Sequence, residues 1–178
     1  AQFEGMKERS IIVNGVSKAY AMTGWRIGFI AAPQWIVKGC NKLQGQYTSG
    51  PCSVSQKAAE AAYTLPQDCV ETMRQAFERR RDLIVSLAKE IPGLEVNKPE
   101  GAFYLFPKCS SFFGKTDGQR TINNSTDFAM YLLEVGHVAT VGGDAFGDPD
   151  CFRMSYATSD DNIKEAMSRI KNALSLLK

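Results

Sequence analysis

Apolar residues recur at helical spacing over two long stretches of this chain. Between residues 68 and 90 they form one stripe, which Pro92 and Gly93 then interrupt. A second stripe follows Ser159, a residue type that caps helix N-termini. The spacing therefore predicts two amphipathic helices. Their apolar positions are Val70, Met73, Phe77, Ile84, Leu87 and Ile91 in the first, and Ile163, Met167, Ile170, Leu174 and Leu177 in the second.

Short continuous apolar runs predict strands in other parts of the chain. Residues 10–13 and 27–32 read as two buried strands joined by a loop. After Gly93 the pattern changes to alternating short strands and helices, which is typical of an α+β module. The remaining predicted elements are strands at 94–96, 102–106, 138–141 and 152–156, a helix from Pro33 toward Leu43, an alanine-rich helix capped by Ser53 or Ser55 that ends near Thr64, and a helix that begins at Ser125 or Thr126 and ends at Gly136.

Charge and composition exclude several classes of protein. The net charge of +2 gives no strong attraction to nucleic acid or to a membrane surface. Acidic residues are interleaved with the basic run at 79–81, which favours a solvated helix face over a nucleic-acid site. No apolar run approaches the roughly 20 residues that span a bilayer, and the first residues lack the apolar segment of a secretory signal. We therefore expect a cytoplasmic protein.

The cysteines and the single histidine argue against a metal centre. The five cysteines are scattered and form no Cys-x-x-Cys pair. Free buried thiols in a reducing cytosol are the expected state. His137 falls at a predicted helix-to-strand junction and is expected to be structural.

The loop between the first two strands holds the most informative residues. Lys18 is flanked by small residues, and Arg26 stands between Gly24 and Gly28. A guanidinium is a natural partner of phosphate, which it holds with two parallel hydrogen bonds. An amine that forms imines beside such an arginine suggests a phosphorylated aldehyde cofactor. A solvated loop lysine and a structural ion pair are the alternatives for the two residues taken singly.

Three segments resemble one enzyme family. Residues 15–28, Gly-Val-Ser-Lys-Ala-Tyr-Ala-Met-Thr-Gly-Trp-Arg-Ile-Gly, resemble the cofactor attachment signature of the class I and II aminotransferases, in the form typical of the bacterial aspartate aminotransferase branch. Residues 100–104 and 151–159 resemble the family's Gly-Ala-Phe-Tyr strand and its Arg-x-Ser-Tyr segment. The order and approximate spacing of the three segments match the family, so the resemblance covers nearly the whole chain.

The resemblance implies a cofactor and a role for each motif residue. It implies that Lys18 holds pyridoxal 5′-phosphate as a Schiff base, that Arg26 binds its phosphate, and that Ser17 adds a hydroxyl hydrogen bond. Many relatives place a phosphate-binding serine where this chain has Gly15. Arg153 would bind the substrate α-carboxylate. The reaction implied is transfer of an amino group between an L-amino acid, aspartate or similar, and a 2-oxo acid.

The resemblance also implies an α/β fold and a domain organisation. Residues 1–50 would be a remnant of the fold-type-I large domain, with the strand–lysine loop–strand unit. Residues 51–90 would be connecting helices, and residues 91–178 the small C-terminal α+β domain. The chain would be the C-terminal part of a homodimeric enzyme and inactive alone, because the residues that contact the cofactor ring are missing. A β-lyase or synthase on the same fold, the effector domain of a cofactor-dependent transcription regulator, and a mere folding or dimerisation module remain alternatives.

Overall fold

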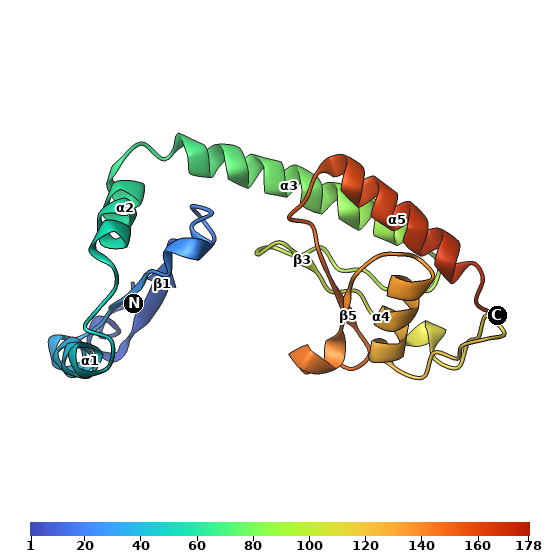
Figure 1. Cartoon of the computed structure of the whole chain (residues 1–178), viewed down its shortest axis with the longest axis horizontal. Coiled ribbons are helices and arrows are strands. Elements are labelled where there is room, and N and C mark those ends of the chain that lie inside the picture. The colour runs from blue at the N-terminus through green and yellow to red at the C-terminus, as the bar shows by residue number, and fades with distance from the viewer. The chain divides into compact units, whose positions relative to one another are not determined.

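The computed structural model describes all 178 residues, and the chain forms two compact units. The first comprises Ala1–Met73 and the second Arg74–Lys178. The boundary falls inside helix α3, Asp68–Lys89, so this helix contributes to both units (Figure 1). The long helix predicted from the apolar stripe is thus confirmed.

The first unit is built on a two-stranded antiparallel sheet. Strand β1 is Ile12–Gly15 and strand β2 is Gly28–Ala31, paired so that Gly15 faces Gly28. Helix α1, Gln34–Tyr47, and helix α2, Ser53–Thr64, follow in the chain. Short 3₁₀ turns lie at Lys7–Arg9 and at Thr23–Trp25. Both predicted strands are confirmed.

The prediction that these two strands are buried is wrong for this chain. The side chain of Val13 is 76% exposed and that of Trp35 is 75% exposed, and only Val16 and Ser55 are buried in this unit. A sheet of two strands has two faces and two edges to cover, and residues 1–73 do not supply enough structure to cover them. The apolar runs therefore predicted strand correctly and burial incorrectly.

The second unit contains the hydrophobic core. Its three-stranded antiparallel sheet has the order β3–β5–β4, and helices pack against it. Core side chains come from α3, from both later helices and from the sheet, and Phe128, Phe152 and Ile170 are fully buried. The elements are strands β3 (Tyr104–Leu105), β4 (Val141–Gly142) and β5 (Phe152–Ser155), helices α4 (Ser125–Glu134) and α5 (Asp160–Leu174), and 3₁₀ turns η3 (Ser110–Phe112) and η4 (Gly143–Phe146).

Several element ends differ from the sequence-based expectations. The predicted strand at 94–96 is a single bridge between Glu95 and Lys108, and the strand at 102–106 shortens to Tyr104–Leu105. The strand predicted at 138–141 is found at Val141–Gly142 and overlaps the prediction at one residue. Helix α1 continues to Tyr47, beyond the predicted helix that runs toward Leu43. The length of such short strands depends on backbone pairing with the adjacent strands, and the apolar runs in the sequence do not indicate where this pairing ends.

The helix caps were predicted with mixed success. Ser159 caps α5 as predicted, because its hydroxyl accepts a hydrogen bond from the Asn162 N–H at 3.1 Å. Asn124, not a hydroxyl residue, caps α4. Cys52 occupies the N-cap position of α2, so neither Ser53 nor Ser55 is the cap.

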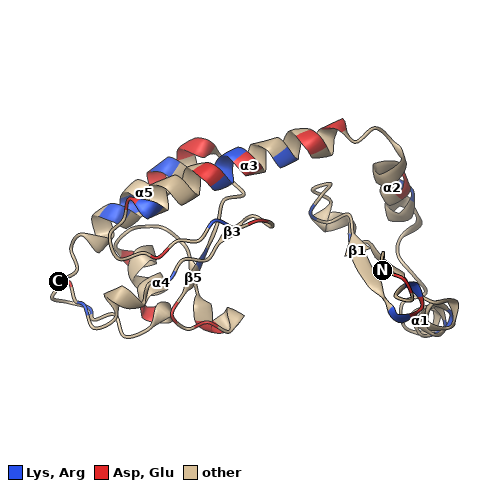
Figure 2. Ribbon diagram, turned by 180° about the vertical axis from the view of Figure 1, so that it is seen from behind, with Lys and Arg blue, Asp and Glu red and all other residues tan.

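Acidic and basic residues are interspersed along α3 and α5 (Figure 2). Arg79 and Arg80 both pair with Asp160 at the start of α5, at 3.0 and 3.4 Å. Lys171 approaches Glu90 to 3.7 Å, so α5 lies along the C-terminal part of α3. The expected mixed-charge helix face is confirmed. None of the helices combines the length and the apolar character that crossing a membrane requires.

All five cysteines are free, and the expectation that they are buried holds for only two. Cys109 and Cys151 are buried, and the other three, Cys40, Cys52 and Cys69, are exposed. Burial raises the pKa of Cys109 to about 12 and that of Cys151 to about 11. The two buried thiols are therefore protonated and unreactive at neutral pH.

Candidate functional site

Two glycines bring the ends of the lysine loop close together. A Cβ at Gly15 would lie 3.0 Å from the carbonyl oxygen of Ile27, and a Cβ at Gly28 would lie 3.0 Å from that of Asn14. These contacts are with backbone atoms, so a larger residue would force the strands apart. The close pairing of Gly15 with Gly28 therefore closes the loop that carries Lys18 and Arg26.

The predicted cofactor residues line one open hollow beside this loop. Ser17, Lys18 and Arg26 border it together with Asn14, and its volume is roughly 540 Å³. Ser17 is half-buried, whereas Lys18 and Arg26 are exposed. Lys18 is therefore open to solvent within this chain, because only residues of the loop and of the strand ends border the hollow.

Arg26 has an unusual backbone conformation. It lies in the left-handed region at φ 50° and ψ 53°, which costs a non-glycine residue on the order of 1–2 kcal/mol. Its Nη1 donates to the carbonyl oxygen of Thr23 at 2.8 Å. A guanidinium has five N–H donors, so most of the fork remains available to a ligand. Strain of this kind is concentrated at binding sites.

Aromatic contacts hold the lysine loop to α2. Val16 is buried, and the hydroxyl of Tyr20 donates to Gln67 Oε1 at 2.7 Å. The Tyr63 ring packs in a T-shaped arrangement against the Tyr20 ring, with the two centroids 5.2 Å apart, and against the Phe29 ring, with the two centroids 5.6 Å apart. The sequence pattern gives no signal for Tyr63 or Gln67, which lie more than 40 positions after Tyr20.

Arg153 lies in the second unit, on the central strand β5. Its Cζ is 4.4 Å from the ring centroid of Tyr104 and 4.2 Å from that of Phe146. No acidic side chain pairs with Arg153. The residue is half-buried, and its partners within the chain are two aromatic rings.

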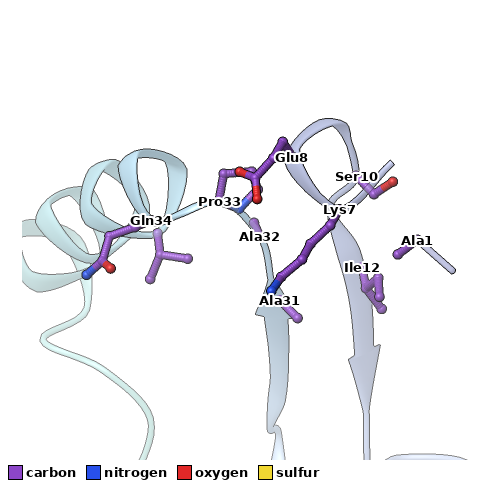
Figure 3. A pocket seen from close by; sticks show the side chains of 10 residues that line it. Ala1, Lys7, Glu8, Ser10, Ile12, Ala31, Ala32, Pro33 and Gln34 are labelled. Atoms are coloured by element: carbon purple, nitrogen blue, oxygen red, sulfur yellow. The ribbon is translucent and has the colours of Figure 1, made fainter. Parts of the chain in front are cut away.

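Another hollow of the first unit lies away from the predicted site residues. It is bordered by Lys7, Glu8, Ser10 and the start of α1, next to Ala1 (Figure 3). The Lys7 side chain extends across it toward Ala31, between the ends of the two strands. None of Ser17, Lys18, Arg26 or Arg153 borders this hollow.

Comparison with known proteins decides the family. The sequence profile described as aminotransferase class I and II matches residues 2–170. The chain belongs to the class I and II aminotransferases. The resemblance seen in the three motifs is thereby confirmed, as is the α/β, fold-type-I character of the chain. Enzymes of this family depend on pyridoxal phosphate.

Individual aminotransferases match over almost the whole chain. An aspartate aminotransferase of Rhizobium meliloti (strain 1021) is 50% identical over 175 residues, which are 97% of this chain and 43% of that protein. A bifunctional aspartate aminotransferase and glutamate/aspartate-prephenate aminotransferase of Petunia hybrida is 49% identical over 182 residues, which are 100% of this chain and 38% of that protein. This chain therefore spans about two fifths of the length of these relatives.

A solved structure shows the same fold. The crystal structure of the aspartate aminotransferase from Rhizobium meliloti superposes with a TM-score of 0.94 at 48% identity. The match covers 99% of this chain and 44% of that one. An aromatic aminotransferase from Pyrococcus horikoshii OT3 matches at a TM-score of 0.87 and 40% identity, over 98% of this chain and 45% of that one.

Proposed function

We propose that this chain is the part of a pyridoxal-phosphate-dependent aminotransferase that carries the cofactor-binding lysine. The whole enzyme would transfer an amino group between an L-amino acid, aspartate or a similar one, and a 2-oxo acid. One observation carries the proposal: Lys18 and Arg26 border the same hollow, beside a glycine pair that closes the loop between them. The names of the relatives support aspartate as a substrate.

The residues around the lysine loop fit pyridoxal phosphate chemically. Its aldehyde needs a primary amine, and its phosphate needs hydrogen-bond donors with positive charge; Lys18 and Arg26 offer both at one hollow. When bound, pyridoxal phosphate supplies an electron sink for the bond broken at the substrate α-carbon. The protein's part is to bind, to orient and to move a proton.

We assign the proton transfer to Lys18. Its Nζ would take the proton from the substrate α-carbon as a general base and return it as a general acid. Arg26 would hold the phosphate through the N–H groups that Thr23 does not occupy, and the Ser17 hydroxyl would add one hydrogen bond at the edge of the same hollow.

We assign Arg153 to the substrate α-carboxylate. Its guanidinium has no acidic partner in the chain and matches a carboxylate in a two-point hydrogen bond. Lysine offers a point charge in place of that planar fork, so the two residues are not equivalent here.

The division into residues 1–50, 51–90 and 91–178 is part of the same proposal, as are a homodimeric whole enzyme and a cytoplasmic location. Residues 1–50 would then be the remnant of the large domain. The 178-residue chain alone would be inactive, because it carries no residues for the cofactor ring.

Replacing Lys18 tests the proposed catalytic role. In the whole enzyme that contains this chain, Lys18→Ala is expected to abolish transamination, because no other amine borders the hollow. Steady-state assays with aspartate and 2-oxoglutarate measure the loss, and Lys42→Ala, which removes an exposed lysine on α1, is the matched control. Reduction with borohydride and peptide mapping then locates the covalently attached cofactor. Substantial turnover by Lys18→Ala, or attachment at another lysine, would contradict the assignment.

Replacing Arg153 tests substrate binding. Arg153→Lys is expected to raise the KM for the amino acid by about tenfold or more, because a charge-assisted two-point contact becomes a one-point contact. Arg169→Lys is the control, since Arg169 lies on α5 in an i,i+4 pair with Glu165. An unchanged KM in Arg153→Lys would count against the carboxylate role.

A further inference from the structure

Arg153 differs from every other arginine of the second unit. The other six each pair with a carboxylate, whereas Arg153 pairs with none. A half-buried cation without a counter-ion is unusual and indicates a binding site for an anionic ligand. The six paired arginines are Arg74, Arg79, Arg80, Arg81, Arg120 and Arg169.

The first ring against Arg153 comes from one side of the sheet. Phe152 and Met154 are buried on β5, so Arg153 projects from the opposite face. Tyr104 on β3 pairs with Ser155, which shares that face, and this register places the Tyr104 ring diagonally across from Arg153. The result is the 4.4 Å separation between the Arg153 Cζ and the ring centroid.

The second ring comes from the other side of the sheet. Val141 on β4 pairs with Arg153, and η4 follows this strand and ends at Phe146. The Phe146 ring is 45% exposed, yet its centroid lies 4.2 Å from the Arg153 Cζ. Because β5 lies between β3 and β4, the two rings approach the guanidinium from opposite flanks.

The turn that carries Phe146 is rigidly placed. The N–H of Gly143 donates to the carbonyl oxygen of Cys151 at 2.8 Å, and any Cβ at Gly143 would collide with backbone oxygens. Gly147 ends the turn at φ 84°, a conformation that favours glycine. Phe106 meets the Phe146 ring edge-on at 6.1 Å. These contacts hold the Phe146 ring at a defined position beside Arg153.

We propose that Tyr104 and Phe146 are positioning residues that clamp the Arg153 guanidinium between two rings and present its free N–H edge to a single substrate carboxylate. The proposal rests on the proposed carboxylate role of Arg153. Ring faces attract a guanidinium and shield it from water, so the cation loses mobility before substrate arrives. Less ordering then remains to be done on binding, which lowers the KM without changing the chemical step.

Variants that remove either ring test the clamp in the whole enzyme. Tyr104→Leu and Phe146→Leu are each expected to raise the KM for aspartate by roughly three- to tenfold, with kcat changing less. Tyr104→Phe keeps the ring and should retain the KM. Phe113→Leu is the matched control, because it removes a half-buried ring of the same unit that does not meet Arg153.

The outcomes separate this proposal from the proposed function. If Arg153→Lys raises the KM and neither leucine variant does, the carboxylate role stands and the clamp is overturned. If Arg153→Lys leaves the KM unchanged, both are overturned. A rise in Tyr104→Phe equal to that in Tyr104→Leu also overturns the clamp, since the ring is then irrelevant.

A spectroscopic measurement tests the geometry independently of activity. Protons between two ring faces are shifted upfield, so in the 178-residue chain the Arg153 Nε–H resonance should lie upfield of those of the ion-paired arginines. Tyr104→Leu and Phe146→Leu should each move it downfield, and Phe113→Leu should not. A resonance unmoved by both leucine variants would overturn the clamp.

Discussion

Replacing Gly143 with alanine is the sharpest test of how the second unit is built. The added Cβ would lie 2.0 Å from the carbonyl oxygen of Asp148 and 2.3 Å from that of Cys151. Both carbonyls accept hydrogen bonds, from the Cys151 N–H at 3.2 Å and from the Gly143 N–H at 2.8 Å, and both bonds must distort to make room. Two weakened bonds at about 1 kcal/mol each, with about 1–3 kcal/mol of overpacking strain, lower the free energy of unfolding by about 3–5 kcal/mol.

Urea unfolding followed by far-UV circular dichroism measures this loss. A domain is typically stable by about 5–15 kcal/mol, so the effect is a large fraction of the total and lowers the urea midpoint by about 2 M. Both tryptophans, Trp25 and Trp35, lie in the first unit, so their fluorescence reports on that unit separately. Gly101→Ala is the control, because no atom lies within 4 Å of a Cβ there. A midpoint for Gly143→Ala equal to that of Gly101→Ala would refute the reasoning.

Three further predictions concern the exposed thiols, the buried thiols and a helix cap. Alkylation of the native chain at pH 8, followed by mass spectrometry, should add alkyl groups to the three exposed cysteines only. Cys52 should react first, because the Ser55 N–H lowers the pKa of its thiol. Five additions would show that the buried thiols of Cys109 and Cys151 are accessible. Burial raises the pKa of the Cys109 and Cys151 thiols above the ordinary value of 9.0, so the unfolded state loses these protons at lower pH than the folded state. The contribution of the two thiols to the free energy of unfolding should therefore be complete below about pH 9 and fall as the pH rises toward 12. A urea midpoint that is the same at pH 8 and pH 10 would be inconsistent with this. Ser159→Ala should cost about 1 kcal/mol in thermal melts while Ser159→Asp retains stability, and equal losses in both variants would argue against capping.

Much of the second unit was predictable because its signals are local. The apolar stripes of α3 and α5 repeat every three or four residues, and Ser159 stands directly before its helix. The candidate cofactor site was predictable for the same reason, since Lys18 and Arg26 lie in one loop between two recognisable strands. Local spacing is sufficient where the interacting groups are close in the chain.

Burial and strand length were not predictable in this way. The apolar runs of β1 and β2 predicted buried strands, but burial depends on what covers the sheet, and the side chains of Ile12 and Val13 are exposed. The strand predicted at 94–96 is an isolated bridge and the one at 138–141 is found at Val141–Gly142, because pairing with neighbours, and not side-chain hydrophobicity, sets where a strand begins and ends. Tyr63 and Gln67 support the lysine loop from a separate helix end, and no short-range pattern marks them.

The sequence by itself determined the main helices, the lysine loop and the family, because each depends on residues that are near neighbours in the chain. Only the tertiary structure decided what surrounds Arg153. The order β3–β5–β4 places Tyr104 on one flank of the central strand and Phe146 on the other, and it leaves the guanidinium without a carboxylate. Pairing between strands that are distant in the chain creates this arrangement, and such pairing is settled only when the whole sheet and its core assemble.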